Sequence, residues 1–262
     1  MHPNKPAMFF CSFPKTGRTW VRFILANYFN EKYSLGLQID FNNMFQLFPN
    51  HGQDTQRGLP AYRYSNHDAI PLLIFDHSPY YQSYSNHKVI FQMRDIFDTL
   101  VSCYFQAKNR LGQYPYDIKS FIREADFGVP RLAGYINSWS AGLDTTPHLV
   151  LVYEQMHKDA KLTIANLLEF IKADLDESVL EKAIQASDFQ RMKKIEVDKG
   201  FPNPDLKTNT GVDNNALRAR EGKVGNYTEY LDSKDIKYIK RTCDRLLNAQ
   251  SKKMLNELEL AL

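Results

Sequence analysis

Cysteine is scarce in this chain of 262 residues, which holds only Cys11, Cys103 and Cys243. These three cysteines lie far apart and lack the close paired spacing of zinc or redox motifs, so we expect no metal site. An odd number of separated cysteines also argues against a disulfide framework. The sequence therefore predicts a reduced, intracellular compartment and a cytoplasmic protein.

Long apolar runs and a dominant charge are missing as well. The longest apolar runs, such as residues 149–153, are far shorter than the roughly 20 residues that a membrane-spanning helix needs, and residues 1–7 contain no apolar signal core. The 33 basic and 30 acidic residues leave a formal charge of +3, too small to indicate nucleic-acid binding. We expect neither membrane insertion nor a nucleic-acid partner, and the oligomeric state stays open.

Short, bulky apolar runs alternate with helical patterns along the chain. The runs have the length and composition of strands buried on both faces of a parallel sheet, and they cover residues 8–13, 71–76, 87–93 and 148–153. Apolar residues recur at helical spacing in residues 19–30, 95–108, 118–125, 130–143, 161–172, 178–186, 189–194 and 232–260. This alternation predicts one α/β domain over residues 1–262, with a P-loop-containing parallel β-sheet flanked by helices on both faces.

The first predicted strand leads into a loop with the outline of a phosphate-binding loop. Ser12-Phe13-Pro14-Lys15-Thr16-Gly17-Arg18-Thr19 departs from G-x-x-x-x-G-K-[ST] because Ser12 replaces the first glycine and Arg18 the lysine. A strand enters the loop and a helix leaves it, so free backbone N–H groups and the helix dipole would converge on an anion, with Lys15 as an added cation. The residues alone also fit an ordinary strand-to-helix turn with a surface lysine.

Two segments together resemble the sulfotransferases that use 3′-phosphoadenosine 5′-phosphosulfate (PAPS). Phe13-Pro14-Lys15-Thr16-Gly17-Arg18-Thr19-Trp20 resembles their 5′-phosphosulfate-binding loop, and VIFQMRDIFDTLVS, residues 89–102, resembles their 3′-phosphate segment. The resemblance implies that Arg94 and Ser102 hold the 3′-phosphate, while the donor's 5′ end is bound by Lys15, Thr16, Gly17, Arg18, Thr19 and Trp20. Read alone, Arg94 equally fits a salt bridge with Asp95 or Asp98.

A third segment resembles the carboxyl-terminal donor motif of the same family, Arg-Lys-Gly-x-x-Gly-Asp-Trp. It reads Arg220-Glu221-Gly222-Lys223-Val224-Gly225-Asn226-Tyr227, so Glu221 stands in place of Lys, Asn226 of Asp and Tyr227 of Trp. The resemblance implies that Arg220, Glu221 and Gly222 border the 3′-phosphate, although Glu221 removes a positive charge. It also implies adenine contacts at Trp20, Tyr153, Ser187 and Phe189, where each aromatic side chain fits core packing equally well.

His77 is the predicted catalytic base. It follows an apolar strand, at the sheet edge where α/β active sites lie, and a histidine with a pKa near about 6.5 is partly neutral at pH 7. Phe75-Asp76-His77-Ser78-Pro79 is similar to the family's Lys-Thr-His-x-Pro segment, which implies the catalytic role. Phe75 replaces the family's lysine, so Lys15 is expected to carry more of the catalytic charge.

The sequence thus predicts an enzyme that moves a sulfuryl group from PAPS to an acceptor hydroxyl, leaving adenosine 3′,5′-bisphosphate (PAP). The acceptor would be a carbohydrate, a glycolipid or a small alcohol or phenol, and no motif identifies it. One alternative is a P-loop kinase or ATPase in which Asp76 holds Mg²⁺. Another is a nucleotide-binding protein without catalysis on the same fold, suggested by Phe75 and Glu221.

Overall fold

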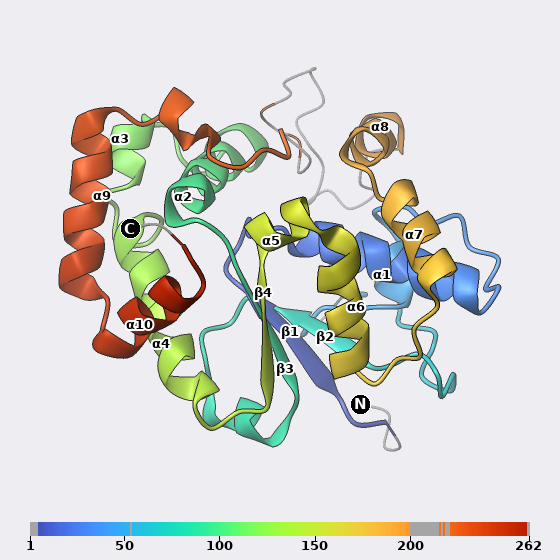
Figure 1. Ribbon diagram of the computed structural model, residues 1–262. Helices are drawn as coiled ribbons and strands as arrows, with labels where there is room; N and C mark the ends of the chain where they lie inside the picture. The colour runs from blue at the N-terminus through green and yellow to red at the C-terminus, as the bar shows by residue number, and fades with distance from the viewer. Residues whose placement is uncertain (1–4, 53, 200–214, 216, 218–220, 261–262) are drawn as a thin grey trace.

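Four parallel strands form the centre of the structure (Figure 1). The computed structural model describes residues 5–52, 54–199, 215, 217 and 221–260. The strands are β1 (Met8–Ser12), β2 (Leu73–Asp76), β3 (Val89–Met93) and β4 (His148–Val152), and their order in the sheet is β2-β1-β3-β4. Because every neighbouring pair is parallel, the carboxyl ends of all four strands meet at one edge, the upper edge in Figure 1.

Helices cover both faces of this sheet, as the sequence predicted. One group, on the left in Figure 1, consists of α2 (Ile96–Phe105), α3 (Ile118–Phe121), α4 (Val129–Leu143), α9 (Ser233–Leu246) and α10 (Ala249–Glu257). The other group consists of α1 (Arg18–Lys32), α6 (Ala160–Phe170) and α7 (Glu177–Ala186). Above the strand ends lie α5 (Tyr153–Lys158) and α8 (Phe189–Lys199), and single turns occupy η1 (Asn43–Gln46), η2 (Gln82–Asn86), η3 (Gln106–Arg110) and η6 (Asn226–Glu229).

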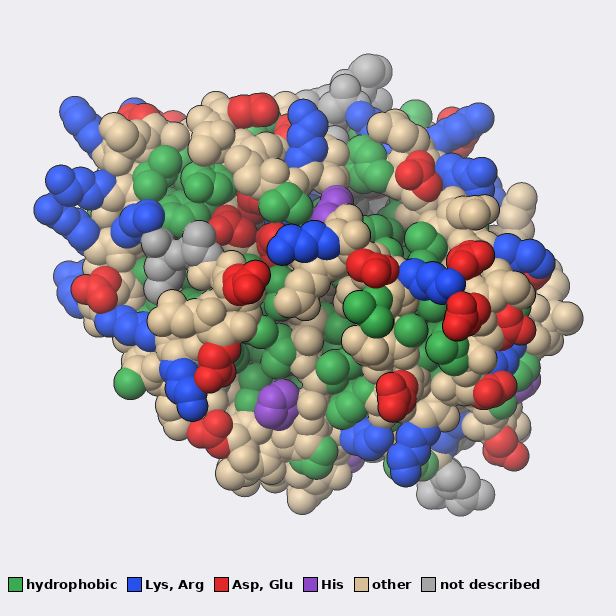
Figure 2. All heavy atoms as spheres, in the orientation of Figure 1, with side chains coloured by type: hydrophobic (Ala, Val, Ile, Leu, Met, Phe, Trp, Pro, Cys, Tyr) green, Lys and Arg blue, Asp and Glu red, His purple; other side chains and the backbone are tan. Residues whose placement is uncertain are grey.

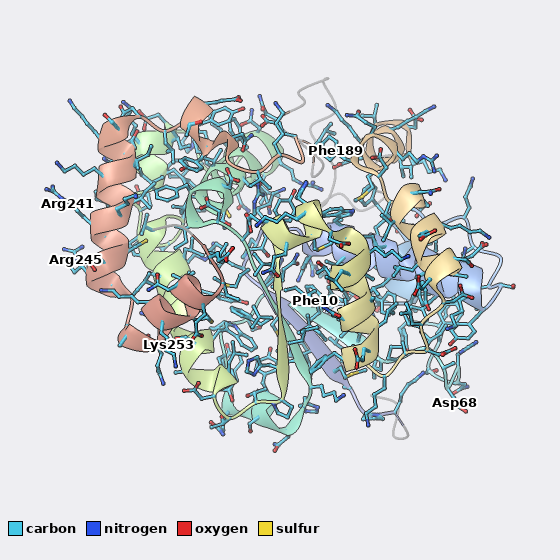
Figure 3. All side chains as sticks on the ribbon, viewed as in Figure 1. Phe10, Asp68, Phe189, Arg241, Arg245 and Lys253 are labelled. Atoms are coloured by element: carbon cyan, nitrogen blue, oxygen red, sulfur yellow. The ribbon has the colours of Figure 1, made fainter. Side chains whose placement is uncertain are left out.

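The side chains of the strands divide between two apolar cores, one on each face. Phe10, at the middle of β1 in Figure 3, is fully buried with the α1, α6 and α7 helices. Its neighbour Cys11 points to the opposite face and joins Phe91 and Trp139 in the second core. Side chains alternate between faces along a strand, so unbroken apolar runs are what a sheet covered on both sides requires.

The carboxyl-terminal segment differs from its prediction as one amphipathic helix over residues 232–260. Leu247 is extended, with φ −74° and ψ 131°, and separates α9 from α10. The side chain of Asn248 then accepts a hydrogen bond from the Ser251 N–H at 2.7 Å and starts a new helix. Asn248, an N-cap residue inside the apolar repeat, is the local signal from which this break could have been predicted.

The described part of the chain has no helix that could span a membrane. It also holds no cluster of three His, Cys, Asp or Glu side chains arranged to bind a metal ion. Basic and acidic side chains are mixed over most of the face in Figure 2. Arg241 and Arg245 point outward from α9 in Figure 3, away from the strand ends.

Candidate active site

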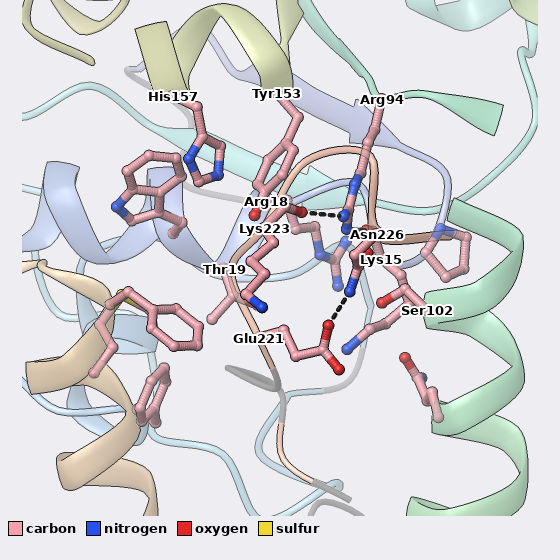
Figure 4. A pocket seen from close by; sticks show the side chains of 18 of the residues that line it. Lys15, Arg18, Thr19, Arg94, Ser102, Tyr153, His157, Glu221, Lys223 and Asn226 are labelled. Atoms are coloured by element: carbon pink, nitrogen blue, oxygen red, sulfur yellow. Dashed lines mark hydrogen bonds between the residues drawn. The ribbon is translucent and has the colours of Figure 1, made fainter. Parts of the chain in front are cut away.

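A cavity of about 290 Å³ opens at the carboxyl ends of the strands. It brings together most of the site residues predicted from the sequence: Lys15, Gly17, Arg18, Thr19, Trp20, His77, Arg94, Ser102, Tyr153, Phe189, Glu221 and Gly222. Figure 4 shows several of them converging from different elements. Thr16 and Ser187 do not line the cavity, and Arg220 lies outside the described residues.

The strand order arranges these residues along the sheet edge. His77 follows β2, the Lys15 loop follows β1, Arg94 follows β3 and Tyr153 follows β4. In the order β2-β1-β3-β4 the histidine therefore stands at one end and the aromatic residue at the other. An elongated ligand laid across the strand ends would meet the loop and the arginine between them.

The loop after β1 exposes backbone donors to the cavity. Gly17, with φ +100°, precedes the first residue of α1, and no side chain caps that helix. The first N–H groups of an uncapped helix and its dipole favour an anion. A Cβ at Gly17 would stand 2.4 Å from Cδ2 of Tyr153, so a glycine is required there. Thr16 closes the loop from within, since its hydroxyl donates to the Phe13 carbonyl at 3.0 Å.

Arg94 is held by contacts that leave part of its guanidinium available. Nη1 donates to the Lys15 carbonyl at 3.3 Å and Nη2 to the Lys223 carbonyl at 3.0 Å. Nη2 also lies 3.4 Å from the carboxylate of Asp98, so the salt bridge and a place in the cavity wall coexist. Nε is buried and has no hydrogen-bond partner among the described residues. A phosphate in the cavity would accept from the part of the guanidinium that lines the wall.

The third motif is tied to the start of α2 by one carboxylate. Asp98 accepts hydrogen bonds from the Gly225 N–H at 2.8 Å and the Tyr227 N–H at 3.1 Å. Its side chain is fully buried, and the contacts place Gly222 and Lys223 beside Arg94. Residues separated by more than 120 positions thereby form one wall of the cavity.

Two departures from the family motif compensate each other. The Glu221 carboxylate accepts a hydrogen bond from the Asn226 side-chain amide, drawn as a dashed line in Figure 4. Its other oxygen accepts from the Tyr230 hydroxyl at 2.6 Å. An aspartate at position 226 would repel Glu221, whereas an amide donates to it. The acidic residue is thus bound to the turn below the cavity.

Aromatic rings form the far end of the cavity. Tyr153 and His157 lie one helical turn apart on α5, with ring centroids 4.7 Å apart, and Trp20 packs edge-on to Tyr153 at 6.0 Å. The Trp20 Nε1–H donates to the carbonyl of Ser187 at 3.1 Å. The Ser187 hydroxyl instead donates to the Ala183 carbonyl, so this residue positions Trp20 without facing the cavity. Phe189 faces these rings from α8, near the top of Figure 3.

His77 is fixed in one tautomer at the other end of the cavity. Its Nδ1 lies 2.6 Å from the carbonyl oxygen of Ser12, the last residue of β1. A carbonyl oxygen only accepts, so Nδ1 carries the proton and Nε2 keeps its lone pair in the neutral ring. Burial, together with the positive charge of Arg18, lowers the pKa of His77 well below 6.5. The ring can therefore accept a proton at Nε2 near neutral pH.

We expect His77 to stay neutral at pH values well below 6.5. In the unfolded chain the pKa of a histidine is about 6.5, above that of His77 in the folded protein. As the pH falls below about 6.5, the unfolded chain therefore binds a proton before the folded protein does, and the free energy of unfolding decreases. An NMR titration of the imidazole ¹H–¹³C resonances, assigned with His77→Gln, measures the midpoint directly. A midpoint at or above that of the urea-unfolded protein would contradict the expected burial.

Asp76 occupies a different position from that of a magnesium ligand. One oxygen accepts from the His77 N–H at 2.6 Å and from Ser78, and the other from the Tyr84 hydroxyl at 2.6 Å and from His51. These hydrogen bonds lower the pKa of Asp76 to about 2 against the opposing effect of burial. The carboxylate does not line the cavity. It anchors the end of β2, which removes the structural basis for the kinase alternative.

Several cavity residues had not been identified from the sequence. His157 had a local signal, since it lies four positions after Tyr153 on one helix. Phe41 and Arg57 come from residues 30–65, a segment without sustained periodicity, and the other lining residues outside the predicted site set are Pro14, Gln106, Met192, Lys223 and Asn226. Tyr80 and Tyr84, which follow β2, pack against Trp139 and do not line the cavity.

Known proteins share this sequence pattern and architecture. The family model described as "Sulfotransferase domain" matches residues 5–254. Cytosolic sulfotransferase 17 of Arabidopsis thaliana is 28% identical over 255 residues, which cover 85% of this chain and 69% of that protein. Flavonol 3-sulfotransferase of Flaveria bidentis is 25% identical over 264 residues, covering 95% of this chain and 83% of that one.

Solved structures agree with the fold. Retinol dehydratase, in complex with androsterone and the inactive cofactor PAP, has a TM-score of 0.67 at 17% identity, covering 95% of this chain and 82% of that one. A mouse sulfotransferase complexed with PAP has a TM-score of 0.66 at 18% identity, and the match covers 96% of this chain and 88% of that one. The family model covers nearly the whole chain and confirms the family predicted from the motifs. The chain belongs to the sulfotransferases, the enzymes that take a sulfuryl group from PAPS and release PAP.

Proposed function

We propose that this sulfotransferase binds PAPS across the strand ends and uses His77 as the base that activates an acceptor hydroxyl. The observation that carries the proposal is the hydrogen bond between His77 Nδ1 and the Ser12 carbonyl, which leaves Nε2 as a proton acceptor beside the Lys15 loop. The reaction forms a bond between the acceptor oxygen and sulfur and breaks the bond between sulfur and the phosphate oxygen. The proton of the hydroxyl passes to Nε2.

The proposed donor orientation follows the order of the residues along the sheet edge. The adenine would lie among Trp20, Tyr153 and Phe189, and the 3′-phosphate beside Arg94 and Ser102. The 5′-phosphosulfate would lie on the loop, where Lys15 and the N–H groups at the start of α1 meet it. This orientation directs the sulfuryl group toward His77, because the loop lies between β2 and β3 in the sheet.

Lys15 and Arg18 are proposed to supply the positive charge for the transition state. Phe75, which stands where the family has a lysine, is fully buried, and its ring stacks on Phe10 at 4.6 Å. No cation reaches the cavity from that position. Arg18 lines the cavity beside His77 and affects its protonation, so its guanidinium is near the reacting group. Fixed cations of this kind stabilise the charge that develops on the leaving oxygens.

The acceptor is proposed to be a small molecule or a carbohydrate or lipid that carries a hydroxyl group. Support comes from relatives whose names or titles record flavonol, androsterone and retinol. A cytoplasmic location is proposed as well, supported by the name of the Arabidopsis relative, a cytosolic sulfotransferase.

The donor site can be tested by thermal-shift titration with PAP, adenosine 5′-phosphate and Mg-ATP. We expect PAP to stabilise the protein most, because only PAP offers a 3′-phosphate to Arg94. Arg94→Gln should remove most of the preference for PAP over adenosine 5′-phosphate, roughly a 10- to 100-fold change in affinity ratio. Arg123→Gln, which alters an exposed arginine away from the cavity, is the control. Stabilisation by Mg-ATP alone would contradict the proposal.

A further inference from the structure

Arg57 reaches the cavity from the side of His77, opposite the donor contacts. The backbone before it runs along the free edge of β2, where the Phe75 N–H donates to the Pro49 carbonyl at 2.9 Å and the His51 N–H donates to the Phe75 carbonyl at 2.8 Å. β2 is an edge strand of the sheet, so this segment lies beyond it. Arg57 nevertheless lines the same cavity as His77 and Arg18.

The backbone that carries Arg57 is held by a partly buried polar network. The Asp54 carboxylate accepts from the Asn50 N–H at 2.7 Å and the Asn50 side-chain amide at 2.9 Å. The side-chain oxygen Oδ1 of Asn50 in turn accepts from Nη2 of Arg22 at 2.6 Å. Arg22 is 3% exposed, with its guanidinium 4.0 Å from the centre of the Phe75 ring. The Arg57 N–H then donates to the Asp54 carbonyl at 3.1 Å, which fixes the start of its side chain.

Arg57 and Arg18 form a pair of positive charges at this end of the cavity. Arg18 is half-buried in the wall; burial lowers its pKa to about 10, the positive charge of Arg57 adds to this effect, and Tyr135 and Asp76 oppose it. Neither arginine forms an ion pair with a carboxylate among the residues that the structure describes. Glu221 is the single carboxylate among the described lining residues, and it is bound to Asn226 and Tyr230. Two guanidinium groups that line one cavity, with no carboxylate in an ion pair with either among the described residues, favour an anion from outside the protein.

The donor accounts for one of these two charges. In the proposed orientation the sulfuryl group lies between the loop and His77, within the region that Arg18 lines, and the phosphates lie farther along, toward Arg94. The segment that leads to Arg57 lies beyond β2, the strand that His77 follows, and in the proposed orientation the acceptor hydroxyl approaches Nε2 from this side. The anion that Arg57 would meet therefore belongs to the acceptor.

We infer that the acceptor carries an anionic group near its reacting hydroxyl and that Arg57 binds this group. The inference rests on the proposed function, because it takes the side of His77 as the acceptor side. The substrate class is then a hydroxylated carboxylate, such as an acidic sugar or a phenolic acid, or a hydroxylated phosphate or sulfate ester. Arg57 is the residue that selects such an anion over a neutral analogue.

Matched pairs of acceptors test the inference. Initial rates of transfer from labelled PAPS would be measured for 4-hydroxyphenylacetate against its methyl ester and for glucuronate against glucose. The wild-type kcat/KM should favour the charged member of the productive pair by about tenfold or more. Arg57→Gln should remove this preference and Arg57→Glu should reverse it, with the dissociation constant for PAP unchanged within about twofold. Arg63→Gln, an exposed arginine on the same segment outside the cavity, should keep the preference.

Three results would overturn the inference. The first is equal kcat/KM for both members of each pair, and the second is a preference that survives Arg57→Glu. The third is a loss of PAPS affinity in Arg57→Gln without a loss of PAP affinity, which would assign Arg57 to the sulfuryl group of the donor. A wild-type protein that transfers sulfate to no acceptor would instead count against the proposed function. Charge preference would then be read from binding of the same pairs to the protein–PAP complex, where equal affinities would reject it.

Discussion

Replacing His77 by alanine should lower the turnover number at saturating PAPS by about 10³-fold, within the range of roughly 10² to 10⁴ that a positioned base contributes. The variant has no group at the position of Nε2, so the acceptor hydroxyl must lose its proton to water. The hydrogen bond from Nδ1 to Ser12 is also lost, but the loop and the Arg94 contacts stay. Transfer from labelled PAPS measures the loss, and calorimetric titration with PAP should give an unchanged dissociation constant.

His157→Ala is the matched control for this change. His157 lines the same cavity but lies at the aromatic end, against Tyr153 and Trp20. Its loss should weaken donor binding and leave the turnover number at saturating PAPS nearly unchanged. Equal losses of turnover in the two variants, or full turnover in His77→Ala, would remove His77 from the role of base.

Replacing Lys15 by methionine should lower kcat/KM for PAPS by about 10²- to 10³-fold, as expected for loss of one fixed cation at a developing charge. Methionine keeps most of the length of the unbranched side chain and removes the charged amino group. Any residue other than glycine at position 15 must adopt the same positive φ of 70°, so the strain in the loop is unchanged. Steady-state kinetics with labelled PAPS measure the effect, and most of it should fall on the turnover number.

Lys223→Met provides the comparison for Lys15. Lys223 also lines the cavity, yet it belongs to the motif beside Arg94, away from the proposed position of the sulfuryl group. We expect it to change the affinity for PAP more than the turnover number. If Lys15→Met weakened PAP and PAPS equally and left turnover intact, Lys15 would bind the donor without stabilising the transition state.

The sequence predicted the parts of the site that depend on local pattern. The loop around Gly17, the strand before Arg94 and the histidine after β2 each lie where a short apolar run meets turn residues or a helix. All strands of a parallel sheet end at one edge, so the three segments that follow these strands must lie near one another. A prediction of the parallel sheet is therefore enough to predict that they share a site.

Other features depend on contacts between distant residues and have no local signal. Arg57 reaches the cavity only because residue 50 pairs with Phe75 at the edge of β2, in a segment without periodicity. Asp76 accepts hydrogen bonds from the Tyr84 hydroxyl and from His51. The residues next to Asp76 in the sequence do not indicate these partners. The sequence shows that Glu221 and Asn226 each differ from the family motif. Only the structure shows that the two side chains form a hydrogen bond with each other.

The buried carboxylate of Asp98 has a consequence for how the protein responds to its donor. It joins α2 to Gly225 and Tyr227, 127 and 129 residues later, and one of its oxygens also pairs with Arg94. A 3′-phosphate bound at Arg94 would therefore be linked energetically to the packing of residues 225–227 on α2. We therefore expect bound PAP to stabilise the contacts of Gly225 and Tyr227 with α2 as well as the nucleotide site itself.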